Sequence, residues 1–94
     1  YSLVGIAEDL LALDRAGEAI EFLERARTIR EAVGDPGELG EAECLLGRAL
    51  VEGAGSEAEE SRGRELGQAG VAHLDEAGDN WTAQARDCRA WMAR

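Results

Sequence analysis

The sequence predicts an all-α fold of about five helices, packed as antiparallel pairs. One helical spacing recurs along the chain: a large residue, an apolar residue three positions later, a small residue next, and another apolar residue three positions after that. The three copies, of which the last two are imperfect, are Leu3-Ile6-Ala7-Leu10, Glu43-Leu46-Gly47-Leu50 and Trp81-Gln84-Ala85-Cys88. Small residues at fixed helical positions let two helices approach closely, and copies that recur every ~34 to 45 residues are typical of helical arrays. Capping residues followed by apolar positions at three- and four-residue intervals support the same fold class.

The first two predicted helices span residues 3–13 and 16–33. Ser2 caps the first helix, whose apolar positions are Leu3, Ile6, Leu10 and Leu13. Residues 14–17 supply a turn, in which Asp14 tolerates the left-handed conformation better than most residues. The second helix carries its apolar stripe at Ala19, Ile20, Leu23, Ala26, Ile29 and Val33. Two amphipathic helices joined by so short a turn are expected to be antiparallel neighbours.

The third and fourth predicted helices span residues 36–51 and 57–77. Gly34 ends the preceding helix, and Asp35 followed by Pro36 forms the clearest helix start in the sequence. The segment 53–55 breaks the third helix, and Ser56 caps the fourth. Within the fourth helix, Gly63, Gly67 and Gly70 each cost about 1 kcal/mol of helix stability relative to Ala. We therefore expect these glycines to lie against another helix.

The last predicted helix runs from Asn80 toward Arg94. It places on its buried side Trp81, Ala85, Cys88, Trp91 and Met92. Trp81 is expected in the core. Trp91 is expected to point in a different direction around the helix axis, because the ten residues between them are not a whole number of helical turns. Burial of Trp91 is the favoured interpretation because aromatic residues are scarce here, and the alternative is an exposed anchor for a further domain.

With 94 residues, the chain is expected to form one domain, residues 1–94, divided into a first pair at 1–34, a second at 35–78 and a capping helix at 79–94. Tyr1 stands where Met is expected and the helical pattern begins at once, which indicates a fragment of a larger protein.

The formal charge of −10 makes nucleic acid and anionic membrane poor partners.

The sequence contains no apolar run of about 20 residues and no leader, so a cytoplasmic protein is expected. Cys44 and Cys88 have no short metal-binding spacing and are expected to be reduced, buried residues, with a disulfide as the alternative.

Two acidic clusters are candidates for chemistry, and we favour a structural interpretation of both. His73 with Asp75 and Glu76 lacks the further ligands that zinc requires, and a histidine near a helix C-terminus is favoured there by the helix dipole. Three acids flank the start of the fourth helix, where negative charge also suits the dipole: Glu57, Glu59 and Glu60. The sequence contains no nucleophile and base in a catalytic pattern, so we expect no enzyme, no metal and no cofactor.

The chain resembles the tetratricopeptide repeat (TPR) family, in particular the long-period variety typified by the kinesin light chain. The first repeat matches the family pattern at Leu3, Ile6, Ala7, Leu10, Ala19, Leu23 and Ala26. The second matches at Leu46, Gly47 and Leu50, but departs at Glu43, where a large apolar residue belongs, and in its glycine-rich second helix. Similar arrays occur in the C-terminal regions of bacterial serine/threonine kinases and of large multidomain regulators. The resemblance implies a right-handed superhelix; the structural alternative is a plain five-helix bundle.

The same resemblance implies that first helices of the repeats line a concave groove that binds a peptide or partner domain. The candidate partner-binding residues in that groove are Glu8, Leu11, Glu41, Arg48, Glu52, Arg86 and Arg89. Arg48, Arg86 and Arg89 on one wall would suit an acidic peptide or a C-terminal carboxylate, because Arg binds carboxylates bidentately. Alternatively, these arginines neutralise neighbouring acids. The sequence thus predicts a protein-interaction scaffold, with a structural spacer or self-association module as the alternative function.

Overall fold

The computed structural model describes residues 2–94, and this part of the chain is all-α, as the sequence predicts. Its α-helices are α1 (Leu3–Ala12), α2 (Ala16–Val33), α3 (Pro36–Glu52), α4 (Glu57–Ala77) and α5 (Thr82–Met92). A short 3-10 helix, η1 (Asp79–Trp81), precedes α5. Within residues 2–94, none of the helices combines the length and the hydropathy that a membrane-spanning segment requires.

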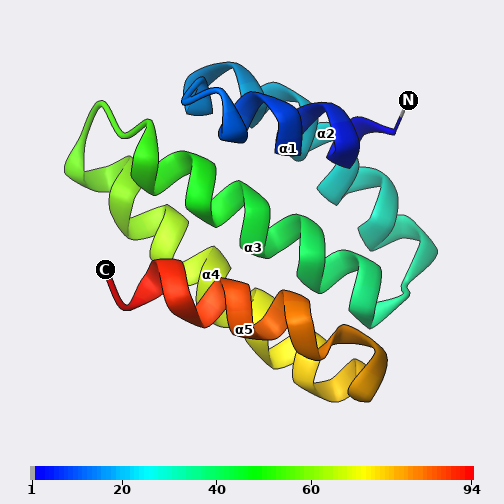
Figure 1. Cartoon of the computed structure of the whole chain (residues 1–94). Helices are drawn as coiled ribbons and strands as arrows, with labels where there is room; N and C mark the ends of the chain where they lie inside the picture. The colour runs from blue at the N-terminus through cyan, green and yellow to red at the C-terminus, as the bar shows by residue number, and fades with distance from the viewer. Residues whose placement is uncertain (1) are drawn as a thin grey trace.

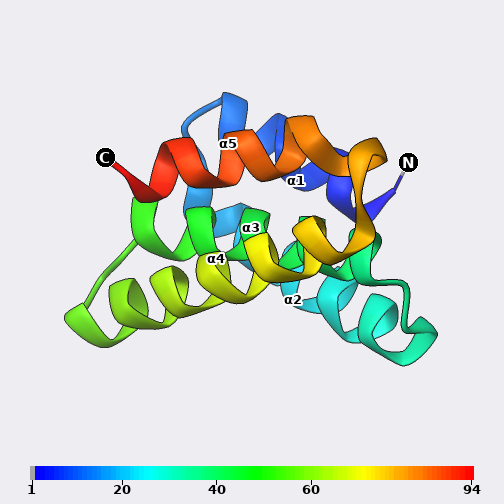
Figure 2. The same ribbon diagram turned by 90° about the horizontal axis from the view of Figure 1, so that it is seen from below.

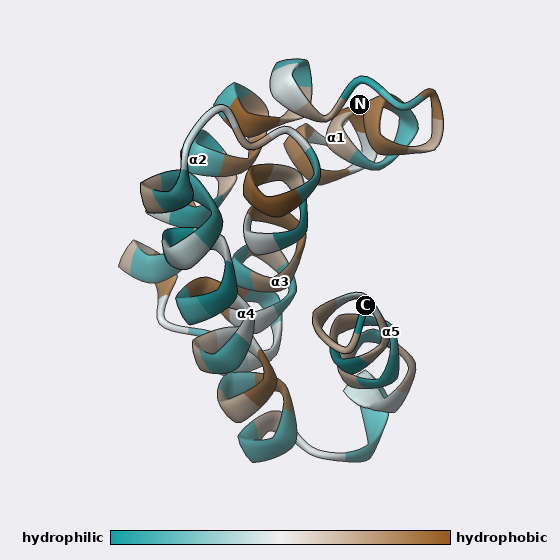
Figure 3. Ribbon diagram, turned by 90° about the vertical axis from the view of Figure 1, so that its left-hand side faces the viewer, coloured by the Kyte–Doolittle hydropathy of each residue, from teal (hydrophilic) through white to brown (hydrophobic). Residues whose placement is uncertain are grey.

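Successive helices alternate in direction and form two layers (Figure 1). α1, α3 and α5 lie on one side of the molecule, and α2 and α4 lie on the other, as the view from below also shows (Figure 2). Seen end-on, α3 lies between α1 and α5, which stand apart from each other (Figure 3). α1 and α5 both contact α3, and residues of all three helices line a hollow. The antiparallel pairs are those the sequence predicts, while the right-handed superhelix stays a prediction.

The helix ends follow the capping residues of the sequence. Ser2, Asp35 and Ser56 each accept a hydrogen bond from the backbone N–H three residues later, which satisfies one of the free donors at a helix start. Gly34 closes α2 with a left-handed φ of 86°. Asp14, with φ of 60°, adopts the left-handed conformation in the turn after α1. α2 and α4 match their predicted bounds, and the last helix differs because it begins as the 3-10 turn.

α3 and α4 pack most closely, through facing glycines. A Cβ atom placed on Gly70 would lie 2.5 Å from Cys44 Sγ and 2.8 Å from the carbonyl oxygen of Gly40. One placed on Gly47 would lie 2.4 Å from the carbonyl oxygen of Gly63. A side chain fits at neither position without moving the opposing backbone, so the close-packing role predicted for the α4 glycines is confirmed.

The buried side chains form two hydrophobic clusters. The first joins α1, α2, α3 and the middle of α4 around Leu23 and Leu46, both with no exposed surface. The second joins α3, α4 and α5 around Leu74 and Trp91. Burial of Trp91 is thus confirmed, at 6% exposure. Trp81 is only partly buried, because it lies in η1 at the edge of the second cluster, where its indole covers Gly37.

Three apolar positions of the predicted stripes are exposed. They are Leu13 at 64%, Ile29 at 56% and Val33 at 71%. Ile29 and Val33 are exposed because α1 has 10 residues and α2 has 18, so the last turns of α2 extend past the helix that covers the rest of its stripe. Leu13 follows the last residue of α1, Ala12, and so lies outside the helix that was expected to include it.

The expectation of two reduced cysteines is wrong. Cys44 on α3 and Cys88 on α5 form a disulfide, with their Cα atoms 5.6 Å apart. Their separation of 44 residues gives no local signal, and only the packing of α5 against α3 brings the two side chains together. Disulfides are rare in cytosolic proteins, so this bond does not support the cytoplasmic expectation.

Candidate functional site

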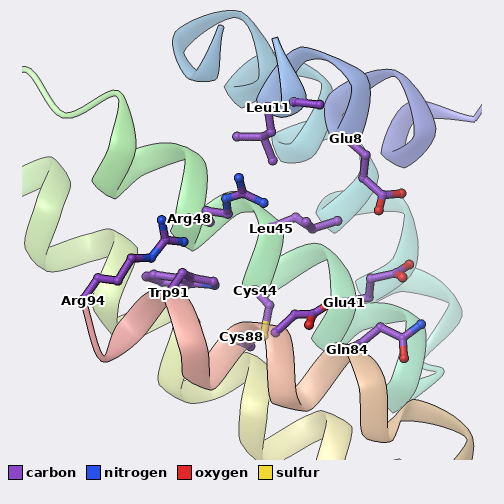
Figure 4. A pocket seen from close by; sticks show the side chains of 12 residues that line it. Glu8, Leu11, Glu41, Cys44, Leu45, Arg48, Gln84, Cys88, Trp91 and Arg94 are labelled. Atoms are coloured by element: carbon purple, nitrogen blue, oxygen red, sulfur yellow. A yellow bond between two sulfur atoms is a disulfide. The ribbon is translucent and has the colours of Figure 1, made fainter. Parts of the chain in front are cut away.

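The candidate site is a groove whose floor is α3 and whose walls are α1 and α5 (Figure 4). It encloses a cavity of about 240 Å³. The residues that line it are Glu8, Leu11, Ala12, Glu41, Cys44, Leu45, Arg48, Gln84, Asp87, Cys88, Trp91 and Arg94. Because α1 and α5 both rest on α3, the groove is a property of the fold and does not depend on a loop.

The middle of the groove is apolar. Leu11 projects from α1 and Leu45 from the floor, and Trp91 contributes from α5 (Figure 4). The disulfide of Cys44 and Cys88 runs across the floor between α3 and α5 and fixes that wall. Apolar surface with a few polar groups at its margins is the usual lining of a binding pocket.

One end of the groove carries two arginines that share a carboxylate. Arg48 Nε donates a hydrogen bond of 2.9 Å to Glu52 Oε2, and Arg94 Nη2 lies 3.5 Å from the same oxygen. Both arginine side chains line the groove, whereas Glu52 lies beside it. The alternative interpretation of Arg48, in which it neutralises a neighbouring acid, therefore describes this structure.

The other end of the groove is acidic. Glu8 of α1 and Glu41 of α3 lie there (Figure 4), and Arg30 of α2 pairs with Glu41 at 2.9 Å from outside the lining. Burial within the groove raises the pKa of Glu8 above its ordinary value, and the nearby carboxylates of Glu41 and Asp9 raise it further, against the opposing charge of Arg30.

Four of the seven predicted residues line the groove: Glu8, Leu11, Glu41 and Arg48. The expected wall formed by Arg48, Arg86 and Arg89 is wrong. Arg89 lies at a separate hollow beside Gly78 and pairs with Asp75 of α4 at 2.5 Å, and Arg86 does not line the groove.

The reason for this difference is the flank of α5 that borders the groove. The expected buried face of α5 is confirmed, because Ala85, Cys88 and Trp91 are all buried. The flank of that face that borders the groove is not the one that carries Arg86 and Arg89. The groove residues that the sequence interpretation missed on α5 are Gln84, Asp87, Trp91 and Arg94. Their three- and four-residue spacing places them on one stripe beside the buried face.

A second polar pair lies across the α3–α4 contact, outside the groove. His73 Nδ1 lies 2.5 Å from Glu43 Oε1, and Glu43 is 4% exposed. The interpretation of His73 by the helix dipole did not include this partner. The pairing also explains why a carboxylate is tolerated at residue 43, where the TPR pattern has a large apolar residue. Residues 2–94 contain no group of three or more side chains placed to hold a metal ion.

Comparisons of the chain with protein-family models, with curated proteins and with solved structures found no match. The resemblance to TPR proteins therefore stays a prediction that rests on the helical spacing alone.

Proposed function

We propose that this chain is a protein-interaction module that binds an extended segment of a partner in the groove between α1 and α5. One observation carries the proposal: α1 and α5, which both contact α3, enclose with it an apolar groove with charged ends. An apolar cavity with polar groups at fixed positions is the usual form of a binding site. The resemblance to TPR proteins supports the same role, because first helices line the binding groove in that family.

The floor sets the size of the occupant. Glu41, Cys44, Leu45 and Arg48 lie on one face of α3, at three- and four-residue intervals. Seven residues of α-helix separate Glu41 from Arg48, which corresponds to about 10 Å at 1.5 Å per residue. An extended chain rises about 3.3 Å per residue, so about three residues of a partner span the floor.

The test is a selection of peptides from a random library on the immobilised protein, followed by affinity measurements on individual peptides. Leu45→Ser should weaken their binding about tenfold or more, because Leu45 supplies the centre of the apolar floor. Leu13→Ser removes the same side chain from an exposed site outside the groove and should leave affinity unchanged. Equal affinities of the two variants would place binding elsewhere and overturn the proposal.

Self-association is the second candidate function, and the exposed face of α2 favours it. Ile29 and Val33 lie four residues apart on one helix face, both more than half exposed. Sedimentation of the protein over a range of concentrations tests this function. A dimer that dissociates on Ile29→Glu would support it, and a monomer at all concentrations would refute it.

A further inference from the structure

Building on the proposed peptide-binding function, we infer that the segment bound in the groove carries a cationic side chain at the end where Glu8 and Glu41 lie (Figure 4). Its apolar side chain, two residues away, lies over Leu11 and Leu45. The partner class is thus a basic and apolar peptide, in place of the acidic peptide or terminal carboxylate expected from the sequence.

Charge at the acidic end is only partly compensated within the molecule. The ion pairs around the groove join Arg30 to Glu41, and join Arg48 and Arg94 to Glu52. Within residues 2–94, none of these pairs engages Glu8. The carboxylates of Glu8 and Glu41 lie at this end against the single guanidinium of Arg30, so a cation entering here meets a favourable potential.

The state of Glu8 provides support for the same conclusion. Its pKa is raised by partial burial and by the charges of Glu41 and Asp9, which means that its ionised form is disfavoured when the groove is empty. A bound cation would stabilise that ionised form and relieve the repulsion among the carboxylates.

The opposite end offers less to an anionic ligand. Arg48 and Arg94 already share the carboxylate of Glu52, so an anion bound there must compete with an internal partner. This difference between the ends favours a cation as the charged group that the groove recognises.

The spacing follows from α3. Glu41 and Leu45 are separated by one helical turn, about 6 Å along the axis. Side chains two residues apart in an extended peptide lie on the same face and are separated by about 6.6 Å. The preferred occupant is therefore an Arg-x-Leu or Leu-x-Arg segment, since the direction of the peptide is left open by this distance.

The experiment uses fluorescein-labelled nonapeptides with acetylated and amidated ends. Each carries Arg-Ser-Leu or Leu-Ser-Arg at its centre, with flanking Gly and Ser. Two matched peptides replace Arg by citrulline, which keeps the shape and removes the charge, or by Glu. Fluorescence anisotropy on the whole chain should rank them Arg, then citrulline, then Glu, with the preference for Arg decreasing as salt is raised.

Glu8→Gln should reduce the affinity for the Arg peptide about fivefold and leave the affinity for the citrulline peptide unchanged, because it removes one ion pair at the groove rim. Glu21→Gln removes an equal charge from the exposed face of α2 and serves as the matched control, with no change expected.

Two outcomes would contradict the inference, and they are distinguishable. If the citrulline or Glu peptides bind as tightly as the Arg peptide while Leu45→Ser still weakens all of them, the cation inference is wrong and the groove function stands. If none of these peptides binds at millimolar concentration, and library selection also yields no groove-dependent binder, the proposed function fails together with the inference.

Discussion

Reduction of the disulfide between Cys44 and Cys88 should remove a large part of the stability of this chain. The bond closes a loop with a sequence separation of 44 residues. In the chain-entropy treatment, closing a loop of this size lowers the conformational entropy of the unfolded state by about 13 cal/mol/K, which corresponds to a stabilisation of about 4 kcal/mol at 25 °C. Small domains have free energies of unfolding of about 5 to 15 kcal/mol, so this single bond provides a substantial fraction.

The assay compares urea unfolding of the wild-type chain with and without a phosphine reductant. The oxidised chain should be about 3 to 4 kcal/mol more stable than the reduced chain. The double variant Cys44→Ala/Cys88→Ala serves as the control and should not respond to reductant. Trp91 lies in the same buried cluster as both cysteines, so fluorescence should report loosening of α5.

The groove should respond together with stability, because the disulfide attaches its α5 wall to its α3 floor. Groove-dependent peptide affinity is therefore expected to decrease on reduction. Free energies of unfolding that agree within about 0.5 kcal/mol in both conditions would refute this reasoning, since the loop-closure contribution would be absent. Recovery of two free thiols from protein denatured without reductant would refute the disulfide itself.

Three further predictions follow from the packing and the charges. Gly70→Ala should lower the free energy of unfolding by about 1 to 3 kcal/mol in urea, although Ala has the better helix propensity, because the new Cβ meets α3. Gly17→Ala, with no atom within 4 Å of the new Cβ, serves as the control and should be neutral or stabilising. Equal effects of the two variants would contradict the close α3–α4 contact. Because the pKa of Glu8 is raised in the folded chain above the ordinary value of 4.5, stability should decrease as the pH rises from 4.5 through the raised pKa. Glu8→Gln should remove that part of the pH profile and raise the urea midpoint at neutral pH. His73→Ala should cost about 1 to 3 kcal/mol by leaving the buried Glu43 carboxylate unpaired, and a double-mutant cycle with Glu43→Gln should yield a coupling energy, whose absence would show that the two side chains do not interact.

Local signals in the sequence determine the helices. Ser2, Asp35 and Ser56 begin helices by hydrogen bonds that span three residues, and Gly34 ends one by a left-handed φ. These interactions depend only on near neighbours in the chain, and for that reason capping residues and apolar periodicity predict helix bounds well. The α1 and α3 residues of the groove were also predictable, because their phase follows directly from the capped helix starts.

Tertiary structure alone decides the features that depend on how one helix rotates against another. The disulfide and the contact of Glu43 with His73 join residues 30 or more positions apart, and the position of the α5 wall depends on the disulfide. The buried face of α5 is the expected one, but only its packing against α3 and α4 decides which flank borders the groove, and that flank does not carry Arg86 and Arg89. Periodicity gives the direction of a side chain relative to its own helix axis, but only packing against a neighbouring helix fixes how the whole helix is rotated about that axis.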